Sequence, residues 1–207
     1  MRIGPKYKIA RRLGDAIFPK TQKERFAMVE SKKKASLSKK RKHRSSVTEY
    51  GQQFLEKQKV RYTYGVTEKQ LRNLVKTAKS QTKGNVAGEV FKSLETRLDN
   101  VVYKLGFVPT RQFGRQIVGH GHIFVNGKKV SIPSYHVKVS DVIGINPSKR
   151  ESGIFRNKLE ILKEYKSPSW LVLDPEKIEA KVMGWPKMGD YETNLNFPVV
   201  VQFYSRV

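Results

Sequence analysis

The side chains best suited to chemistry in this sequence are cations and hydrogen-bonding groups gathered between Glu95 and Lys129. Arg111 and Arg115 are four residues apart, so a helix would place them one turn apart on its surface. This pattern predicts a compact scaffold that holds cations in fixed positions. The groups concerned are Arg97, Arg111, Arg115, His120, His122, Lys128 and Lys129.

The net charge of +24 over 207 residues indicates what these cations bind. Such a charge repels itself in the free protein and calls for a polyanion, with nucleic acid as the leading candidate. An anionic membrane is a weaker candidate, because no stretch approaches the roughly 20 apolar residues of a spanning helix. The N-terminus lacks the apolar core of a signal peptide, so a cytoplasmic location is expected. Residues 1–44 hold 16 Lys and Arg against 3 Asp and Glu, whereas residues 159–207 hold 6 against 7.

We find no sequence pattern of an enzyme active site. The sequence contains no Walker-type loop, no G-x-G-x-x-G and no cysteine, and therefore no thiolate metal site or catalytic thiol. The histidines lack the spacing of a zinc site, and a polar turn in contact with RNA is favoured for His120 and His122. Asp99 is expected to pair with Arg97 or a turn amide. The sequence thus predicts a non-enzymatic binding protein without metal or cofactor.

Two short helices and a hairpin are expected to position these groups. Gly106 should end the first helix, and Thr110 should cap the second. The pair Asn126-Gly127 is the strongest short-range signal of a hairpin. The buried stripe of the first helix is predicted from its three-and-four spacing to be Leu94, Leu98, Val101, Val102 and Leu105.

Residues 1–44 are predicted to form a basic arm that contacts phosphates. The run from Lys32 to Arg44 cannot bury itself, so it should be extended or disordered when free. An inert solvated tail is the alternative, but a bound polyanion would relieve the repulsion among so many like charges. The candidate contacts are Arg2, Lys6, Lys8, Arg11, Arg12, Lys39, Lys40, Arg41, Lys42 and Arg44.

Residues 45–93 are predicted to be a helical domain in which aromatic side chains alternate with bases. An aromatic ring beside a base can stack on a nucleobase while the base meets phosphate. Thr67 and Gln70 make a capping box ahead of an amphipathic helix. A longer helix from about Val86 is expected to run directly into Leu94. The candidate RNA contacts here are Tyr50, Lys57, Arg61, Tyr64 and Arg72.

Beyond Lys129 the pattern changes from helices to short strands. Val130 and Ile132 should complete the hairpin, and further strands are expected around residues 137–139 and 142–145. A second basic loop at 146–153 then leads to a predicted helix, Phe155 to Glu164. The tail is rich in loops, and its final V-V-V-Q-F-Y is expected to be a strand that packs on the body or on a partner.

The stretch L-E-T-R-L-D-N-V-V-Y-K-L-G-F-V-P-T-R-Q-F-G-R-Q-I-V-G-H-G-H-I-F-V-N-G-K-K-V-S-I-P-S-Y resembles the S-four RNA-binding domain. The motif G-P-K-Y-K-I-A-R-R, the segment E-Y-G-Q-Q-F-L-E-K-Q-K-V-R-Y-T-Y-G and the ending P-S-W-L to V-V-Q-F-Y-S resemble other parts of the ribosomal S-four proteins. The resemblance therefore covers nearly the whole chain and indicates the bacterial or organellar type of this family.

This resemblance implies an α+β fold made of an arm, a helical domain and an inserted S-four domain with a small twisted antiparallel sheet. The expected division is an arm at 1–44, a helical domain at 45–93 completed by 172–207, and an S-four domain at 94–171. The family binds small-subunit rRNA early and nucleates assembly of the body of the subunit. It also lies at the mRNA entrance and contacts the S-five protein, an interface linked to decoding accuracy. Our candidates for that protein contact are Gln53, Phe54, Asn196, Phe203 and Tyr204.

One departure from the family and two alternatives bear on this interpretation. Many members carry zinc-binding cysteines in the arm, but Tyr7 and Ala10 occupy two of those positions here, so zinc is not expected. An RNA-modifying enzyme could use the same module, although no separate catalytic signature is present. A ribosome-associated quality-control protein is the nearer alternative, usually on a much shorter chain. The expected location is the cytoplasmic ribosome, with an organellar ribosome as the other case.

Overall fold

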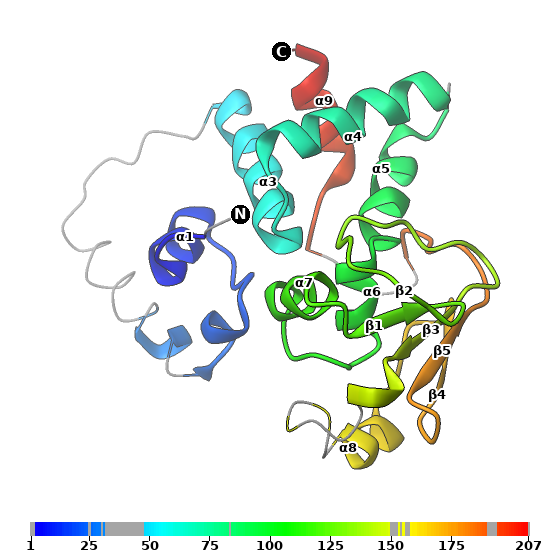
Figure 1. The fold of residues 1–207 in the computed structure, drawn as a ribbon. Helices are drawn as coiled ribbons and strands as arrows, with labels where there is room; N and C mark the ends of the chain where they lie inside the picture. Colours follow the sequence, from blue (N-terminus) through cyan, green and yellow to red (C-terminus); the bar gives the residue numbers. More distant parts are fainter. Residues whose placement is uncertain are drawn as a thin grey trace. The chain divides into compact units, whose positions relative to one another are not determined.

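The computed structural model describes residues 3–24, 26–29, 31, 48–82, 84–149, 153, 155, 158–189 and 194–206. The chain forms two compact units (Figure 1). The first contains residues 1–87 together with 194–207, and the second contains residues 88–193. The domain boundaries expected from the sequence at 44/45, 93/94 and 171/172 stay a prediction.

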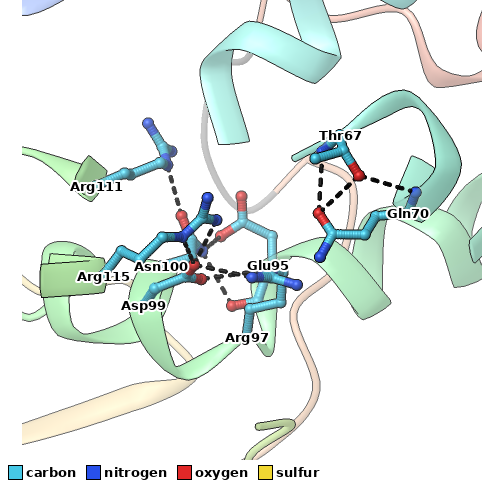
Figure 2. Close-up of polar contacts among 8 residues, drawn as sticks. All are labelled: Thr67, Gln70, Glu95, Arg97, Asp99, Asn100, Arg111 and Arg115. Carbon is cyan, nitrogen blue, oxygen red and sulfur yellow. Dashed lines mark hydrogen bonds and ion pairs between the residues drawn. The ribbon is translucent and has the colours of Figure 1, made fainter. Parts of the chain in front are cut away.

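The described part of the first unit is built from helices. They are α1 (Lys6–Leu13), the 3-10 turn η1 (Pro19–Thr21), α3 (Glu49–Tyr64), α4 (Glu68–Gln81) and α9 (Phe197–Arg206). Gly65 ends α3 with a left-handed backbone, φ 64°. The predicted capping box at the start of α4 is confirmed, since Gln70 N donates to Thr67 Oγ1 and Thr67 N donates to Gln70 Oε1 (Figure 2).

The C-terminal segment is a helix, so the prediction of a strand was wrong. Three buried residues recur every three positions and form one stripe along the helix: Phe197, Val200 and Phe203. The same segment is also rich in valine, which favours strands. The centre of the Phe203 ring lies 5.5 Å from the centre of the Tyr50 ring and 6.3 Å from that of Phe54. Burial against α3 outweighs local β-propensity here. The expectation that this apolar segment packs on the body is confirmed.

The second unit packs helices on a small sheet (Figure 1). Its helices are α5 (Val86–Glu95, which begins just before the boundary), α6 (Leu98–Lys104), α7 (Arg111–Gly119), η2 (Pro147–Lys149) and α8 (Lys158–Glu164). Its strands are β1 (Ile123–Val125), β2 (Lys128–Lys129), β3 (Val142–Ile145), β4 (Leu171–Asp174) and β5 (Glu179–Val182). They form an antiparallel sheet in the order β2-β1-β3-β5-β4. The expected α+β fold is confirmed.

The β1–β2 turn confirms the predicted hairpin at Asn126-Gly127. Both residues have positive φ, 50° and 74°, as a two-residue hairpin turn requires. Asn126 also bonds through its side chain to Asp141 Oδ1 and accepts from Val142 N, both at 2.8 Å. The second arm is shorter than predicted, because β2 ends at Lys129 and Ile132 is 59% exposed.

The predicted buried stripe of the first helix is confirmed, but the predicted continuous helix through this region was wrong. Leu94, Leu98 and their partners at the three-and-four spacing are fully buried. However, α5 ends at Glu95 and α6 starts at Leu98. Leu98 N donates to Tyr135 O at 2.8 Å, and Val137 N donates to Thr96 O at 2.9 Å. These bonds with a distant segment replace helical bonds and interrupt the helix, and they form an isolated antiparallel bridge between Arg97 and His136. Residues 137–139, which the structure describes, form no strand, so that prediction was wrong.

Candidate nucleic-acid interface

A buried carboxylate at the start of α6 holds two arginines. Arg97 Nε and Nη2 donate to Asp99 Oδ1 and Oδ2 at 3.0 and 2.9 Å, and the side chains are 5% and 3% exposed. The expectation that Asp99 pairs with Arg97 is confirmed. Arg115 of α7 reaches the same carboxylate, donating from Nε at 2.9 Å and from Nη2 at 2.7 Å (Figure 2). Because two cations share one buried acid, the cluster keeps a net positive charge.

A chain of hydrogen bonds through Asn100 holds Arg111, the other arginine of α7. Its Nε donates to Asn100 Oδ1 at 2.6 Å (Figure 2). Asn100 Nδ2 in turn donates to Glu95, to the carbonyl oxygen at 3.0 Å and to Oε2 at 2.8 Å. The Arg111 guanidinium lies 4.5 Å from the centre of the Tyr103 ring. Since Glu95 and Asn100 are buried, they fix the Nε side of Arg111 from within the fold.

Close packing of α7 on α6 lets these contacts form. The predicted cap is confirmed, because Phe113 N donates to Thr110 Oγ1 at 3.2 Å. Gly114, between the two arginines, is buried, and a Cβ there would lie only 2.6 Å from the Asp99 carbonyl oxygen. Sequence reasoning missed Asn100 and Gly114 as positioning residues. A glycine inside an otherwise amphipathic helix was the available signal for the second.

The hairpin and the turn before it carry a second group of cations. Lys128, Lys129 and His120 are exposed, and the His120 and His122 rings are 6.1 Å apart. The Lys129 side chain lies over Gly121, where a Cβ would collide with it. Burial first, and then the charges of His120, Lys149 and Lys129, lower the pKa of His122. His122 is therefore a neutral group among cations at physiological pH.

Three predicted contact residues lie inside the protein: Lys57 and Arg97 are 4% exposed and Tyr64 is 3% exposed. Lys57 Nζ donates to Glu68 Oε1 at 2.9 Å and lies 4.7 Å from the centres of both the Phe54 and Phe203 rings.

Glu68 joins this cluster to the C-terminal helix. Tyr204 donates from its hydroxyl to Glu68 Oε1 at 2.6 Å, and Arg61 Nη1 lies 3.5 Å from Oε2. Burial opposes ionisation of Glu68, but the hydrogen bonds from Tyr204 and Lys57 outweigh it and lower its pKa. The carboxylate therefore stays charged and binds α9 to α3 and α4.

The other predicted RNA contacts of the first unit are at its surface or outside the described residues. Lys8, Arg11, Arg12, Arg72 and Tyr50 are exposed, whereas Lys6 and Arg61 are half-buried. The remaining predicted contacts fall outside the described residues: Arg2, Lys39, Lys40, Arg41, Lys42 and Arg44.

The predicted protein-contact residues all make contacts within the first unit. Phe54 and Phe203 pack together, and Tyr204 binds Glu68. Gln53 is buried on α3, and its Nε2 donates to Glu49 Oε1 at 3.0 Å. Asn196 is exposed, and its Oδ1 accepts from Val199 N at the start of α9.

Two further observations concern only the residues that the structure describes. No group of three or more His, Asp or Glu side chains among them could hold a metal ion. None of the helices they form is long and apolar enough to span a bilayer.

Comparison with known proteins decides the family. Residues 1–95 match the model of the ribosomal protein S4/S9 N-terminal domain. Residues 96–143 match the model of the S4 domain, which is the S-four domain named above. A small ribosomal subunit protein uS4 from Roseiflexus sp. (strain RS-1) is 42% identical over 98% of each chain. The chain belongs to the uS4 family. Other uS4 proteins, from Chloroflexus aurantiacus and Shewanella loihica, are 40% and 39% identical over 99% of this chain and 98% of theirs.

The uS4 match spans both units, which the S-four domain alone does not. The family models divide at residues 95 and 96, at the end of α5 and next to the break before α6. The S-four match contains Asp99, Arg111, Arg115 and the hairpin cations. The cation-bearing scaffold found from the sequence is therefore the S-four domain of a uS4 protein.

Proposed function

We propose that this chain is a structural constituent of the small ribosomal subunit that binds small-subunit rRNA directly. Its relatives, which it matches over 98% of their length, are named small ribosomal subunit proteins. The single observation that carries direct binding is the pair Arg111 and Arg115, held on one helix by Asn100 and Asp99. Guanidiniums held in place in this way lose little freedom on meeting phosphates or sugar edges.

We divide the predicted contact residues by their place in the fold. The half-buried arginines of α7 and the basic side chains at the surface of the β1–β2 hairpin, α1 and α4 meet RNA in this proposal. The cations of the arm that lie outside the described residues do so too. Lys57, Tyr64 and Arg97 hold the fold instead, because burial and ion pairs occupy them. Recognition then depends on the shape of a folded RNA, as is usual for proteins that bind RNA junctions.

The finer roles follow the family resemblance. The chain binds a multi-helix junction in the 5′ region of the rRNA early and nucleates the body of the subunit. It also lies near the mRNA entrance and contacts S-five, with an effect on decoding accuracy, in the cytoplasm. Binding needs no zinc, because the sequence has no cysteine. The exposed Asn196 and the outer surface of the α3–α9 pair are our candidates for the protein contact.

A filter-binding experiment tests direct binding. The double variant Arg111→Ala/Arg115→Ala should bind a transcript of the rRNA 5′ region more weakly. The slope of log affinity against log salt should also become shallower, by about 1.4 to 1.8 if each arginine neutralises one phosphate. Unchanged affinity and slope would remove both residues from the RNA contact set.

Co-sedimentation distinguishes a constitutive component from a quality-control factor. A structural constituent should be stoichiometric with small subunits and should survive a high-salt wash. A substoichiometric signal that the wash removes would favour the quality-control alternative. Uridine-to-pseudouridine conversion by the purified chain would favour the enzyme alternative.

A further inference from the structure

Two tyrosines that the sequence analysis did not select lie beside Arg111. Tyr103 is on α6, and its ring centre lies 4.5 Å from the Arg111 guanidinium carbon. Tyr165 directly follows α8 and is 39% exposed. Tyr165 also interacts electrostatically with both Tyr103 and Arg111. The three side chains therefore form one neighbourhood within the second unit, which we call the Tyr165 site.

Gly106 forms the floor of the Tyr165 site. A Cβ on Gly106 would meet three atoms of the Tyr165 ring at 3.0, 3.0 and 3.1 Å. Nearly equal distances to neighbouring ring atoms mean that the ring lies face-on against the glycine. Gly106 also has φ +74°, a conformation that favours glycine. One face of the ring is thus covered by the backbone at Gly106.

A cation lies beside the ring, since Arg111 interacts electrostatically with Tyr165. Burial raises the pKa of Tyr165, so its hydroxyl stays neutral. A partly exposed, neutral tyrosine with a cation beside it is the arrangement on which unpaired nucleobases stack while a phosphate meets the charge.

We propose that an unpaired nucleobase of the bound RNA stacks on Tyr165, beside the Arg111–Tyr103 pair. This proposal rests on the proposed function, since it names a base subsite within the same RNA interface. Charge complementarity selects the occupant, because the site lies beside Arg111 in a chain of net charge +24. The protein supplies the ring, Gly106 sets its plane, and Arg111 meets the phosphate next to the stacked base.

Affinity measurements on the full chain with the 5′-region rRNA transcript test this subsite. Tyr165→Ala should weaken binding by about 5- to 150-fold, the range of one base–aromatic stack, and should leave the salt slope unchanged because no phosphate contact is lost. Tyr165→Phe should bind like the parent, since stacking does not need the hydroxyl. Trp185→Ala is the matched control, because Trp185 is also partly exposed (44%) and also lies beside a cation, Lys92.

Ultraviolet cross-linking of the parent chain gives a second measurement that does not depend on how a variant folds. A nucleotide joined to Tyr165 supports the stack. The base subsite would be overturned, and the proposed function would stand, if the parent chain binds RNA, Tyr165→Ala binds with the same affinity and no nucleotide is cross-linked to Tyr165. No binding by the parent would overturn both. A Tyr165→Ala defect that appears in assembled subunits but not on RNA alone would assign the ring to a protein neighbour and would also overturn the subsite.

Discussion

Two carboxylates in this protein each hold two cations, and they differ in how far water reaches them. Asp99 in the second unit is 3% exposed and holds Arg97 and Arg115. Glu68 in the first unit is 38% exposed and holds Lys57 and Arg61. The Asp99 cluster uses bidentate guanidinium geometry, whereas the Glu68 cluster places a lysine between aromatic rings.

Each cluster encloses one cation and leaves the other partly exposed, but the elements that the two clusters join differ. At Asp99 one cation is enclosed and the other, Arg115, is 28% exposed at the surface of α7. At Glu68 the lysine is enclosed, Arg61 is 20% exposed, and Tyr204 of α9 donates a hydrogen bond to the carboxylate. A carboxylate within a basic protein can thus present a cation to a ligand or fasten a helix. The partners of the carboxylate decide between these roles.

The largest expected effect is the loss of charge at Asp99. Asp99→Asn leaves the enclosed Arg97 guanidinium without its counter-charge, and removing one partner of a buried ion pair costs about 3–5 kcal/mol. The matched variant Glu68→Gln should cost about 1 kcal/mol, because water reaches that cluster. Urea unfolding of both variants measures the two free energies. Equal losses of unfolding free energy in the two variants would contradict the distinction between the enclosed Asp99 cluster and the solvent-accessible Glu68 cluster.

Asp99→Asn also tests whether an acid can support binding to a polyanion. Simple electrostatics predicts tighter RNA binding once a negative charge is removed. If Asp99 positions Arg115, binding should weaken even at temperatures where the variant is folded. Tighter binding would make Asp99 a purely structural residue.

The next effect concerns the backbone contact behind the Asp99 cluster. Gly114→Ala would put a methyl group 2.6 Å from the Asp99 carbonyl oxygen, so α7 must shift away from α6. Overpacking of this kind costs about 1–3 kcal/mol and should lower the melting temperature. Gly119→Ala in the same helix is the control, because a Cβ there meets nothing within 4 Å. Helix propensity alone would make both alanine variants more stable, so the same change in melting temperature for the two variants would contradict a tight α6–α7 contact.

Local signals in the sequence predicted the short-range parts of the fold. The caps at Thr67 and Thr110 and the turn at Asn126 depend on residues only a few positions away, and all three are confirmed. The break between α5 and α6 depends on bonds to Tyr135 and Val137, some 40 residues away, and was missed. The helical C-terminus was missed for the same reason, because its contacts with α3 lie far back in the sequence.

The candidate site divides in the same way. The placing of Arg111 and Arg115 one turn apart follows from α7 periodicity and was predicted. Lys57 was selected as a surface cation, but Glu68 and the two rings around it turn it inward. Charge and spacing identify which residues can bind an anion. They do not show which of those residues the fold encloses.

The smallest expected effect concerns the Glu68 cluster and tests whether its hydrogen bond to Tyr204 holds α9 in place. Tyr204→Phe removes the hydroxyl that donates to Glu68 at 2.6 Å and should cost about 0.5 kcal/mol, the lower end for a hydrogen bond, because water reaches Glu68. Because the folded state lowers the pKa of Glu68, its stabilising contribution is complete above the unfolded pKa of about 4.5 and is lost as pH falls through the folded value. Urea unfolding at pH 7 and at pH 3 should therefore show a Tyr204→Phe penalty that shrinks on acidification. A penalty that is the same at both pH values would mean that the Tyr204 hydroxyl stabilises the fold without help from the charge of Glu68.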